Sequence, residues 1–188
     1  RVKVSAKELK SKGIKVIYSS PLARTRQTAE LTAEILGIPK ENIIIDERIK
    51  EIGAGVFNGK QFSFGDFFRG ITSLDTAIEG GDSPLDVKRR LGEFLYEIND
   101  KHKDENILIV SHGVFFESLD AIINGLNQES SLAKFKEMLG VYTPGSYREF
   151  DFTPLPHSKD FELDLHRPFI DDVVLVKDGK EFRRVKEV

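Results

Sequence analysis

Apolar and polar residues follow two different periods along residues 1–124, and these predict strands that alternate with helices. Short apolar runs rich in β-branched side chains, typical of buried strands, lie at residues 14–18, 43–46 and 107–110. Apolar residues at helical spacing lie in residues 1–12, 22–36, 84–102 and 113–124. This alternation predicts an α/β fold in which helices cover both faces of a parallel sheet.

Residue types at the segment ends support the predicted helix boundaries. Gly13 and Gly37 directly follow two of the helical patterns, and glycine often ends a helix because it adopts a left-handed backbone easily. Asp82 and Ser83 are capping residues, and Pro84 suits the first helical position. By contrast, residues 53–80 are irregular and rich in glycine and phenylalanine, which predicts a long excursion.

The pattern changes beyond residue 140, where helical spacing disappears. Residues 147–152 alternate like a strand. Residues 173–176 and 182–185 flank Asp178-Gly179, a pair typical of tight turns, so we expect a β-hairpin. The predicted division is into a domain and a tail, at residues 1–150 and 151–188.

Composition narrows the class of protein. The formal net charge of −3 shows no excess of basic residues, so composition does not suggest nucleic-acid binding. The absence of cysteine excludes disulfides and thiolate metal sites and fits a reducing cytoplasm. No apolar run approaches the roughly 18 residues of a membrane span. We therefore expect a cytoplasmic protein with no membrane partner.

Both ends of the sequence indicate a fragment. Met138 is the only methionine, so Arg1 is not a translation start. At the other end, residues 183–188 form a charged run without a cap or turn signal. We therefore expect the chain to be part of a longer protein.

Three predicted strand ends carry side chains suited to phosphate chemistry. Arg24 lies in the first turn of a helix, where an anion is favoured. Glu51 follows the second strand and His112 directly follows the third, and such ends meet at one edge of a parallel sheet. Together they would neutralise charge, donate a proton and hydrogen-bond to phosphate. Taken singly, each residue also fits a solvated or structural role, so the prediction depends on the ordered set.

Four short blocks carry a family resemblance. They are residues 19–30 (SSPLARTRQTAE), 51–59 (EIGAGVFNG), 80–83 (GGDS) and 110–113 (VSHG). In this order they resemble the histidine phosphatase superfamily, which includes the phosphoglycerate mutases. The resemblance implies a three-layer αβα fold with Glu51 and His112 as catalytic residues, Glu51 being the proton donor. It implies that Arg24 and His112 bind the phosphate.

One block of that family is missing from the sequence. The nucleophilic histidine of the family belongs to an RHG motif on a first strand, and no RHG motif is present here. The resemblance therefore implies a domain that lacks its first strand and is inactive alone. It places the missing strand inside the sheet, so the neighbouring strands would have unpaired backbone groups and apolar faces.

The tail has a second resemblance. Residues 164–173 (DLHRPFIDDV), with residues 145–150 and 183–188, resemble the connecting region of isoleucyl-tRNA synthetases. The hairpin of that region often carries a cysteine pair for zinc, and the sequence has no cysteine, so we expect no metal. We interpret the chain as a fragment of an isoleucine-tRNA ligase that carries an inserted histidine-phosphatase-like phosphoesterase domain.

This interpretation sets the expected partners. The parent ligase would use ATP, Mg²⁺, isoleucine and tRNA, whereas the inserted domain would bind a phosphorylated small molecule without a cofactor. Two alternatives stay open. The chain is then either a stand-alone histidine phosphatase or phosphoglycerate mutase-like enzyme whose tail resembles a synthetase by chance, or a non-catalytic interaction module.

Overall fold

A computed structural model gives the fold of this chain. It describes residues 1–61, 69–102, 104–123, 129, 132–133, 143–149, 174–177 and 180–183. The structural statements below concern these residues. The phenylalanine-rich part of the predicted excursion and most of the tail lie outside them.

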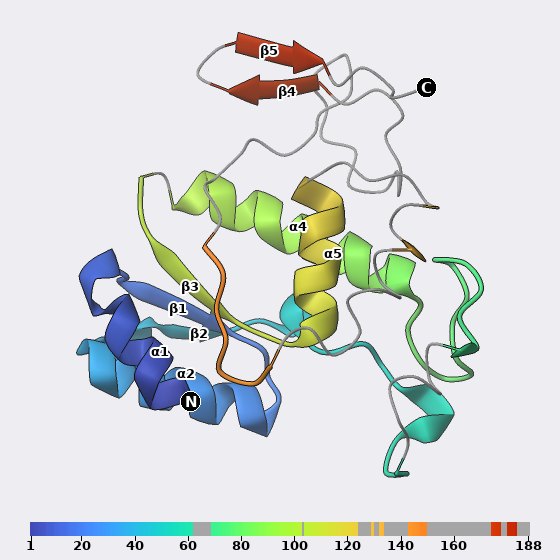
Figure 1. The fold of residues 1–188 in the computed structure, drawn as a ribbon, viewed down its shortest axis with the longest axis horizontal. Coiled ribbons are helices and arrows are strands. Elements are labelled where there is room, and N and C mark those ends of the chain that lie inside the picture. The colour runs from blue at the N-terminus through green and yellow to red at the C-terminus, as the bar shows by residue number, and fades with distance from the viewer. Residues whose placement is uncertain are drawn as a thin grey trace.

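A parallel sheet of three strands forms the centre of the described structure (Figure 1). Its strands are β1 (Val16–Ser19), β2 (Ile43–Ile45) and β3 (Ile107–Val110), in the order β2-β1-β3. In the register of β1 and β3, Val16 pairs with Ile107 and Ser19 pairs with Val110. The prediction that the three apolar runs share one parallel sheet is confirmed, although β1 begins two residues later than predicted.

Four α-helices flank the sheet on two sides (Figure 1). One side has α1 (Val2–Glu8), which continues into the 3-10 helix η1 (Leu9–Lys12), and α2 (Ala23–Leu36). The other side has α4 (Pro84–Lys101) and α5 (Gly113–Ile123). The predicted α/β fold with helices on both faces of a parallel sheet is therefore confirmed.

Alternation of side chains along the strands divides the core between these two layers. Ile17 packs with Ala29 and Ala33 of α2, whereas the next residue, Tyr18, packs with Phe94 of α4 and Phe115 of α5. Successive strand residues point to opposite faces of a sheet, so each strand supplies both cores. Both faces are apolar, which is why the strands read as continuous hydrophobic runs.

Short 3-10 helices lie between α2 and β2 and between β2 and α4. They are η2 (Lys40–Asn42), η3 (Glu47–Ile49) and η4 (Gly55–Phe57). At the start of α4 the Ser83 hydroxyl accepts a hydrogen bond from the Asp86 amide (3.1 Å), and the Asp86 carboxylate accepts one from the Ser83 amide (2.9 Å). This capping box satisfies two backbone donors and fixes where α4 begins.

The tail contains the predicted hairpin. Its strands are β4 (Val174–Lys177) and β5 (Lys180–Arg183), paired antiparallel from Val174 with Arg183 to Lys177 with Lys180. The pairing reaches both sides of the Asp178-Gly179 dipeptide, so the strands lie nearer to it than predicted. The strand expected at residues 147–152 is not formed at residues 147–149, and its remaining residues lie outside the described part.

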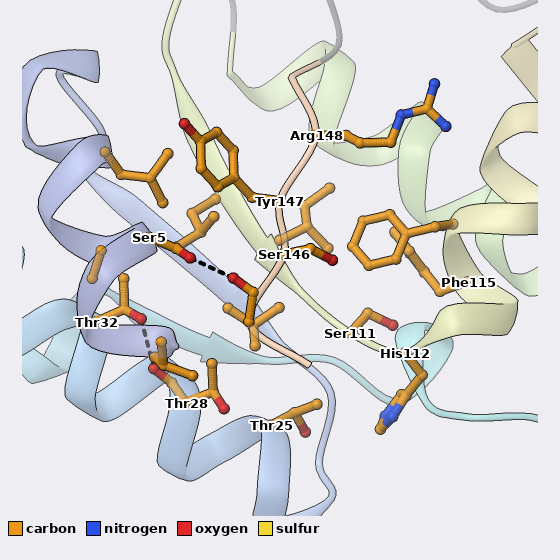
Figure 2. Close-up of a pocket in the computed structure, with 18 of the residues that line it drawn as sticks. Ser5, Thr25, Thr28, Thr32, Ser111, His112, Phe115, Ser146, Tyr147 and Arg148 are labelled. Atoms are coloured by element: carbon orange, nitrogen blue, oxygen red, sulfur yellow. Dashed lines mark hydrogen bonds between the residues drawn. The ribbon is translucent and has the colours of Figure 1, made fainter. Parts of the chain in front are cut away.

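A cavity of about 570 Å³ follows β3. Among the described strands, β3 is paired on one edge only, with β1. Residues 143–149 form another wall of the cavity (Figure 2), attached to the first helices by hydrogen bonds from Ser5 to the Gly145 carbonyl and from Lys12 to Glu149 (2.9 Å). The edge of β3 that does not face β1 thus lies along a partly apolar cavity.

This edge leads to a prediction about solution behaviour. We expect the chain to associate as its concentration rises, because an open strand edge beside apolar side chains pairs readily with another chain. Sedimentation velocity over a concentration series measures the association. A monomer at every concentration, with one sharp and reversible melting transition, would contradict this expectation.

Candidate active site

The candidate site lies where the three parallel strands end. The Ser20 amide donates a hydrogen bond to the Val110 carbonyl (3.0 Å), and the Asp46 amide donates one to the Ser19 carbonyl (3.0 Å). These bonds continue the sheet by one residue and keep the strand ends at one edge. Polar residues that follow the strands therefore collect at this edge, as in other open α/β sheets.

Arg24, Glu51 and His112 meet at this edge. An Arg24 Nη2 atom lies 3.0 Å from His112 Nδ1 and 3.7 Å from a Glu51 carboxylate oxygen. That oxygen lies 3.6 Å from His112 Nδ1. The prediction that the three side chains share one edge is confirmed, while the roles assigned to them stay predictions. All three line the cavity beside β3, and Figure 2 shows His112 at one end of it.

The ring of His112 is held in one tautomer. Its Nε2 atom lies 2.8 Å from the hydroxyl of Ser20, which is fully buried. A guanidinium group only donates hydrogen bonds, so the Nδ1 atom beside Arg24 is an acceptor. The neutral ring then carries its proton on Nε2 and donates it to Ser20. Burial and the charges of Arg24 and Arg90 lower the pKa of His112 to about 4, so the ring is neutral near pH 7.

The Glu51 carboxyl is in an environment that suits an acid. Burial raises its pKa, while a hydrogen bond from the Ile52 amide (3.1 Å) and the charges of Arg24 and Arg90 lower it. Burial outweighs the other effects, so the group holds its proton to a higher pH than an exposed glutamate. A carboxyl that keeps a proton nearer to neutral pH is better placed to donate one.

Arg90 of α4 fixes the loop that carries Glu51. Its guanidinium donates hydrogen bonds to the carbonyls of Arg48 (2.6 Å), Lys50 (2.6 Å) and Glu51 (3.1 Å). It also pairs with Asp82 at 3.5 Å, and Asp82 accepts a hydrogen bond from the Gly53 amide (2.9 Å). One half-buried cation therefore joins α4 to both sides of the acid.

Glycines allow this loop to pack closely against the turn before α4. A Cβ atom on Gly81 would lie 2.4 Å from the Gly53 carbonyl oxygen, which is too close for any side chain. Gly55 has a φ of +51°, and a Cβ atom there would lie 2.2 Å from the Glu79 carbonyl oxygen. The two backbones are joined by a hydrogen bond from the Asp82 amide to the Gly53 carbonyl (3.0 Å). These contacts explain Gly55 of the second sequence block and Gly81 of the third.

Glu117 of α5 is a further ionisable group near the site. The residue is only 3% exposed, and its Oε2 atom has no hydrogen-bond partner. Burial, followed by the negative charge of Glu51, raises the pKa of Glu117 to about 7. A buried carboxyl oxygen without a hydrogen-bond partner is uncommon and calls for an explanation.

The sequence did not reveal Ser20, Arg90 or Glu117 as site residues. Ser20 belongs to the first sequence block, but nothing showed that it would bind His112. Arg90 resembles any charged residue of an amphipathic helix. Glu117 had a weak signal, because it interrupts the apolar stretch of residues 114–119. Their roles depend on contacts between segments far apart in the sequence.

Among the described residues, no three histidine, aspartate or glutamate side chains are grouped as metal ligands would be. No helix in this part of the chain has the length and apolar character that crossing a membrane requires.

Comparisons with known proteins identify relatives. The profile described as histidine phosphatase superfamily (branch 1) matches residues 2–136. Phosphoserine phosphatase 1 of Hydrogenobacter thermophilus is 31% identical over 142 residues, which cover 72% of this chain and 64% of that protein. The Escherichia coli protein named probable phosphoglycerate mutase GpmB is 32% identical over 133 residues, which cover 67% of this chain and 59% of that protein. The chain thus spans less than two thirds of these relatives.

Solved structures show the same fold. The mycobacterial glucosyl-3-phosphoglycerate phosphatase aligns with a TM-score of 0.58 at 21% sequence identity, covering 70% of this chain and 68% of that one. At this level of identity the likeness concerns the fold alone. It agrees with the layered α/β arrangement described above.

The predicted origin from an isoleucine-tRNA ligase is wrong. The matching profile covers most of the chain and describes phosphatases, and the relatives named here are phosphatases and mutases. The synthetase interpretation depended on residues 164–173, a short run rich in charge and turn residues, and so short a run specifies no fold. The four phosphatase blocks, by contrast, lie at strand ends that converge in space. ATP, Mg²⁺, isoleucine and tRNA are therefore removed from the expected partners.

Arg90 provides a test of how the acid is held. We expect Arg90→Lys to lower the free energy of unfolding by about 1–3 kcal/mol, because an ammonium group cannot reach three carbonyls and leaves buried acceptors unpaired. Urea denaturation measures the change. Arg89→Lys, in the neighbouring and more exposed position, is the matched control and should change stability by less than about 0.5 kcal/mol. Equal effects of both substitutions would contradict the bridging role of Arg90.

Glu117 provides a test of the raised pKa. Between the ordinary value of 4.5 and about 7, the folded chain keeps the Glu117 proton and the unfolded chain loses it. Stability should therefore fall as pH rises through this window and level off above it, by on the order of 3 kcal/mol. Denaturation at a series of pH values should show a flatter curve for Glu117→Gln but not for Glu93→Gln on the exposed side of α4. A curve unchanged by Glu117→Gln would show that this carboxyl titrates normally.

Proposed function

The chain belongs to the histidine phosphatase superfamily, and we propose that its Arg24, Glu51 and His112 bind the phosphoryl group of a phosphate monoester and protonate its leaving alcohol. The reaction would be that of a phosphatase or a phosphoglycerate mutase-like enzyme. The observation that carries this proposal is the triangle of 3.0, 3.6 and 3.7 Å formed by the three side chains at the end of the cavity. A cytoplasmic location, expected from the cysteine-free composition, is part of the proposal.

Arg24 would bind the phosphoryl oxygens. Its side chain is 61% exposed, so the guanidinium is open to a ligand. It lies in the first turn of α2, where the helix dipole also favours an anion. A guanidinium fork matches two oxygens of a phosphate at once.

His112 would contribute on the other side of the phosphate. In the free protein its Nδ1 atom accepts a hydrogen bond from Arg24. A dianion that takes over this guanidinium also favours the protonated imidazole, since a nearby opposite charge stabilises the charged form. The ring would then donate a hydrogen bond to the phosphate from Nδ1, while the Ser20 hydroxyl keeps its orientation through Nε2.

Glu51 would supply the proton. When the P–O bond to the alcohol breaks, the leaving oxygen gains negative charge, and a nearby carboxylic acid neutralises it by proton transfer. Its carboxyl lies within 4 Å of the Arg24 and His112 side chains, so it would lie beside the ester oxygen of a monoester bound by those two residues.

His112 is not assigned as the nucleophile that attacks phosphorus. Both ring nitrogens of His112 have partners, Ser20 and Arg24, so His112 is placed for binding rather than for attack. The resemblance assigns the attack to the histidine of an RHG motif, which is not in the printed sequence. We therefore assign binding and proton donation to the three residues and leave the attack on phosphorus to that motif.

Binding of an anion is the direct test of this proposal. We expect inorganic phosphate and vanadate to bind the chain, and Arg24→Ala or His112→Ala to weaken binding at least about tenfold, the loss of one charge-assisted hydrogen bond. Calorimetric titration measures both. Arg26→Ala, an exposed arginine on the same helix, is the matched control and should bind as the parent does.

Two results would overturn the proposal. One is a parent chain that binds neither anion. The other is equal loss of binding in the Arg24 and Arg26 variants, which would indicate a general charge effect. Binding that is specific to Arg24 and His112 but without hydrolysis of any phosphate monoester, even after an RHG strand is restored, would indicate a phosphate-binding module.

A further inference from the structure

Glu117 is the buried charge-bearing group that the proposed reaction leaves unused. It lies one helical turn after Gly113, in the helix that His112 precedes. Residues three apart lie on one side of a helix, so Glu117 shares a side of α5 with Val114. Val114 packs in one cluster with Ile52, the residue after Glu51. Glu117 is therefore on the side of α5 that faces the loop of the acid.

This position matters because the acid itself is close to two cations. Arg24 lies 3.7 Å from the Glu51 carboxylate, and Arg90 donates to the Glu51 carbonyl. Burial raises the pKa of the Glu51 carboxyl, while the charges of Arg24 and Arg90 act in the opposite direction and favour the ionised form. Whenever Glu51 is ionised, the reaction needs a second source for the proton.

We propose that Glu117 is a positioning residue that stores this proton, so that Glu51 and Glu117 form a carboxyl pair holding one proton between them. The proposal rests on the function proposed above for Glu51. Glu117 has the properties that the role requires: it is buried, its Oε2 atom has no hydrogen-bond partner, and it does not line the cavity. Two carboxyl groups that interact titrate as a pair, and the second proton of such a pair is held to a higher pH.

Electrostatics of the two groups agree with this arrangement. The charge of Glu51 is one cause of the raised pKa of Glu117, about 7. The charged groups that act on Glu51 in turn are Arg24 from α2 and Arg90 from α4. Because Glu51 acts on Glu117 as a negative charge, the proposed pair keeps its proton on Glu117, and Glu51 is the ionised member.

Ligand binding would move the proton. A phosphate dianion beside Glu51 disfavours a second negative charge there. The O–H bond of Glu117 breaks and an O–H bond forms on Glu51, directly or through one water, so Glu117 becomes the carboxylate outside the cavity. Glu51 then passes that proton to the departing alkoxide as the P–O bond breaks. Glu51 next takes a proton from water and passes it to Glu117 as the product leaves, which returns the pair to its starting state.

Carbon-13 NMR of the glutamate carboxyl groups tests the pair without any turnover. In the parent chain we expect the chemical shift of the Glu51 carboxyl to change in two steps as the pH rises. The step at higher pH should coincide with the titration of Glu117. Glu117→Gln should leave a single Glu51 step, ending at lower pH. Glu117→Asp, which keeps a carboxyl, should restore the second step, and the exposed control Glu93→Gln should leave both steps in place. A Glu51 titration that is the same in the parent and in Glu117→Gln would overturn the pair.

Sulfate, which stays a dianion over the whole range, tests the transfer. At about pH 6, below the pKa of Glu117, saturating sulfate should move the Glu51 signal toward its protonated position and the Glu117 signal toward its ionised position. A Glu117 signal that does not move while Arg24 responds to sulfate would overturn the storage role. If neither Arg24 nor His112 responds to sulfate, the proposed anion site is wrong. The titration without sulfate then still decides whether Glu51 and Glu117 share a proton.

Discussion

The hydrogen bonds of the His112 ring hold the candidate site together. Through Nε2 the ring is bound to Ser20 at the end of β1, and through Nδ1 it meets Arg24 at the start of α2. Glu51 approaches the same Nδ1 atom from the loop after β2. One neutral imidazole thus joins segments from three strand ends, and the parallel register of those strands is what brings them within reach.

The acid depends on a second set of contacts, on the α4 side. Arg90 donates hydrogen bonds to the carbonyls of Arg48, Lys50 and Glu51, and the backbone of the Gly53 loop lies against the turn before α4. Another link, from the Ser111 hydroxyl to the Ile49 carbonyl (2.7 Å), ties the end of β3 to the same loop. A loop held at this many points can keep a carboxyl within hydrogen-bonding reach of a ligand, which proton transfer requires.

Much of the fold was predictable because it follows from local periodicity. The three strands and the helices of the sheet layers were marked by apolar spacing, and Gly13, Gly37 and Ser83 marked helix ends. The meeting of Arg24, Glu51 and His112 was predictable as well, since parallel strands end at one edge. Ser20, Arg90 and Glu117 were not, because their roles come from contacts between segments distant in the sequence. The synthetase interpretation was wrong because it relied mainly on the short run of residues 164–173. The phosphatase resemblance relied on four blocks that occur in the family's order.

The central proposal is that Arg24, Glu51 and His112 form an anion site, and the ring of His112 reports on it directly. Nitrogen-15 NMR reports which ring nitrogen carries a proton and whether the ring is charged. In the free chain near pH 7 the ring should be neutral with its proton on Nε2, since its pKa is lowered to about 4. Saturating sulfate should shift the Nδ1 signal toward the protonated form in the parent chain but not in Arg24→Ala. A ring that is already charged in the free chain, or one that ignores sulfate, would contradict the site.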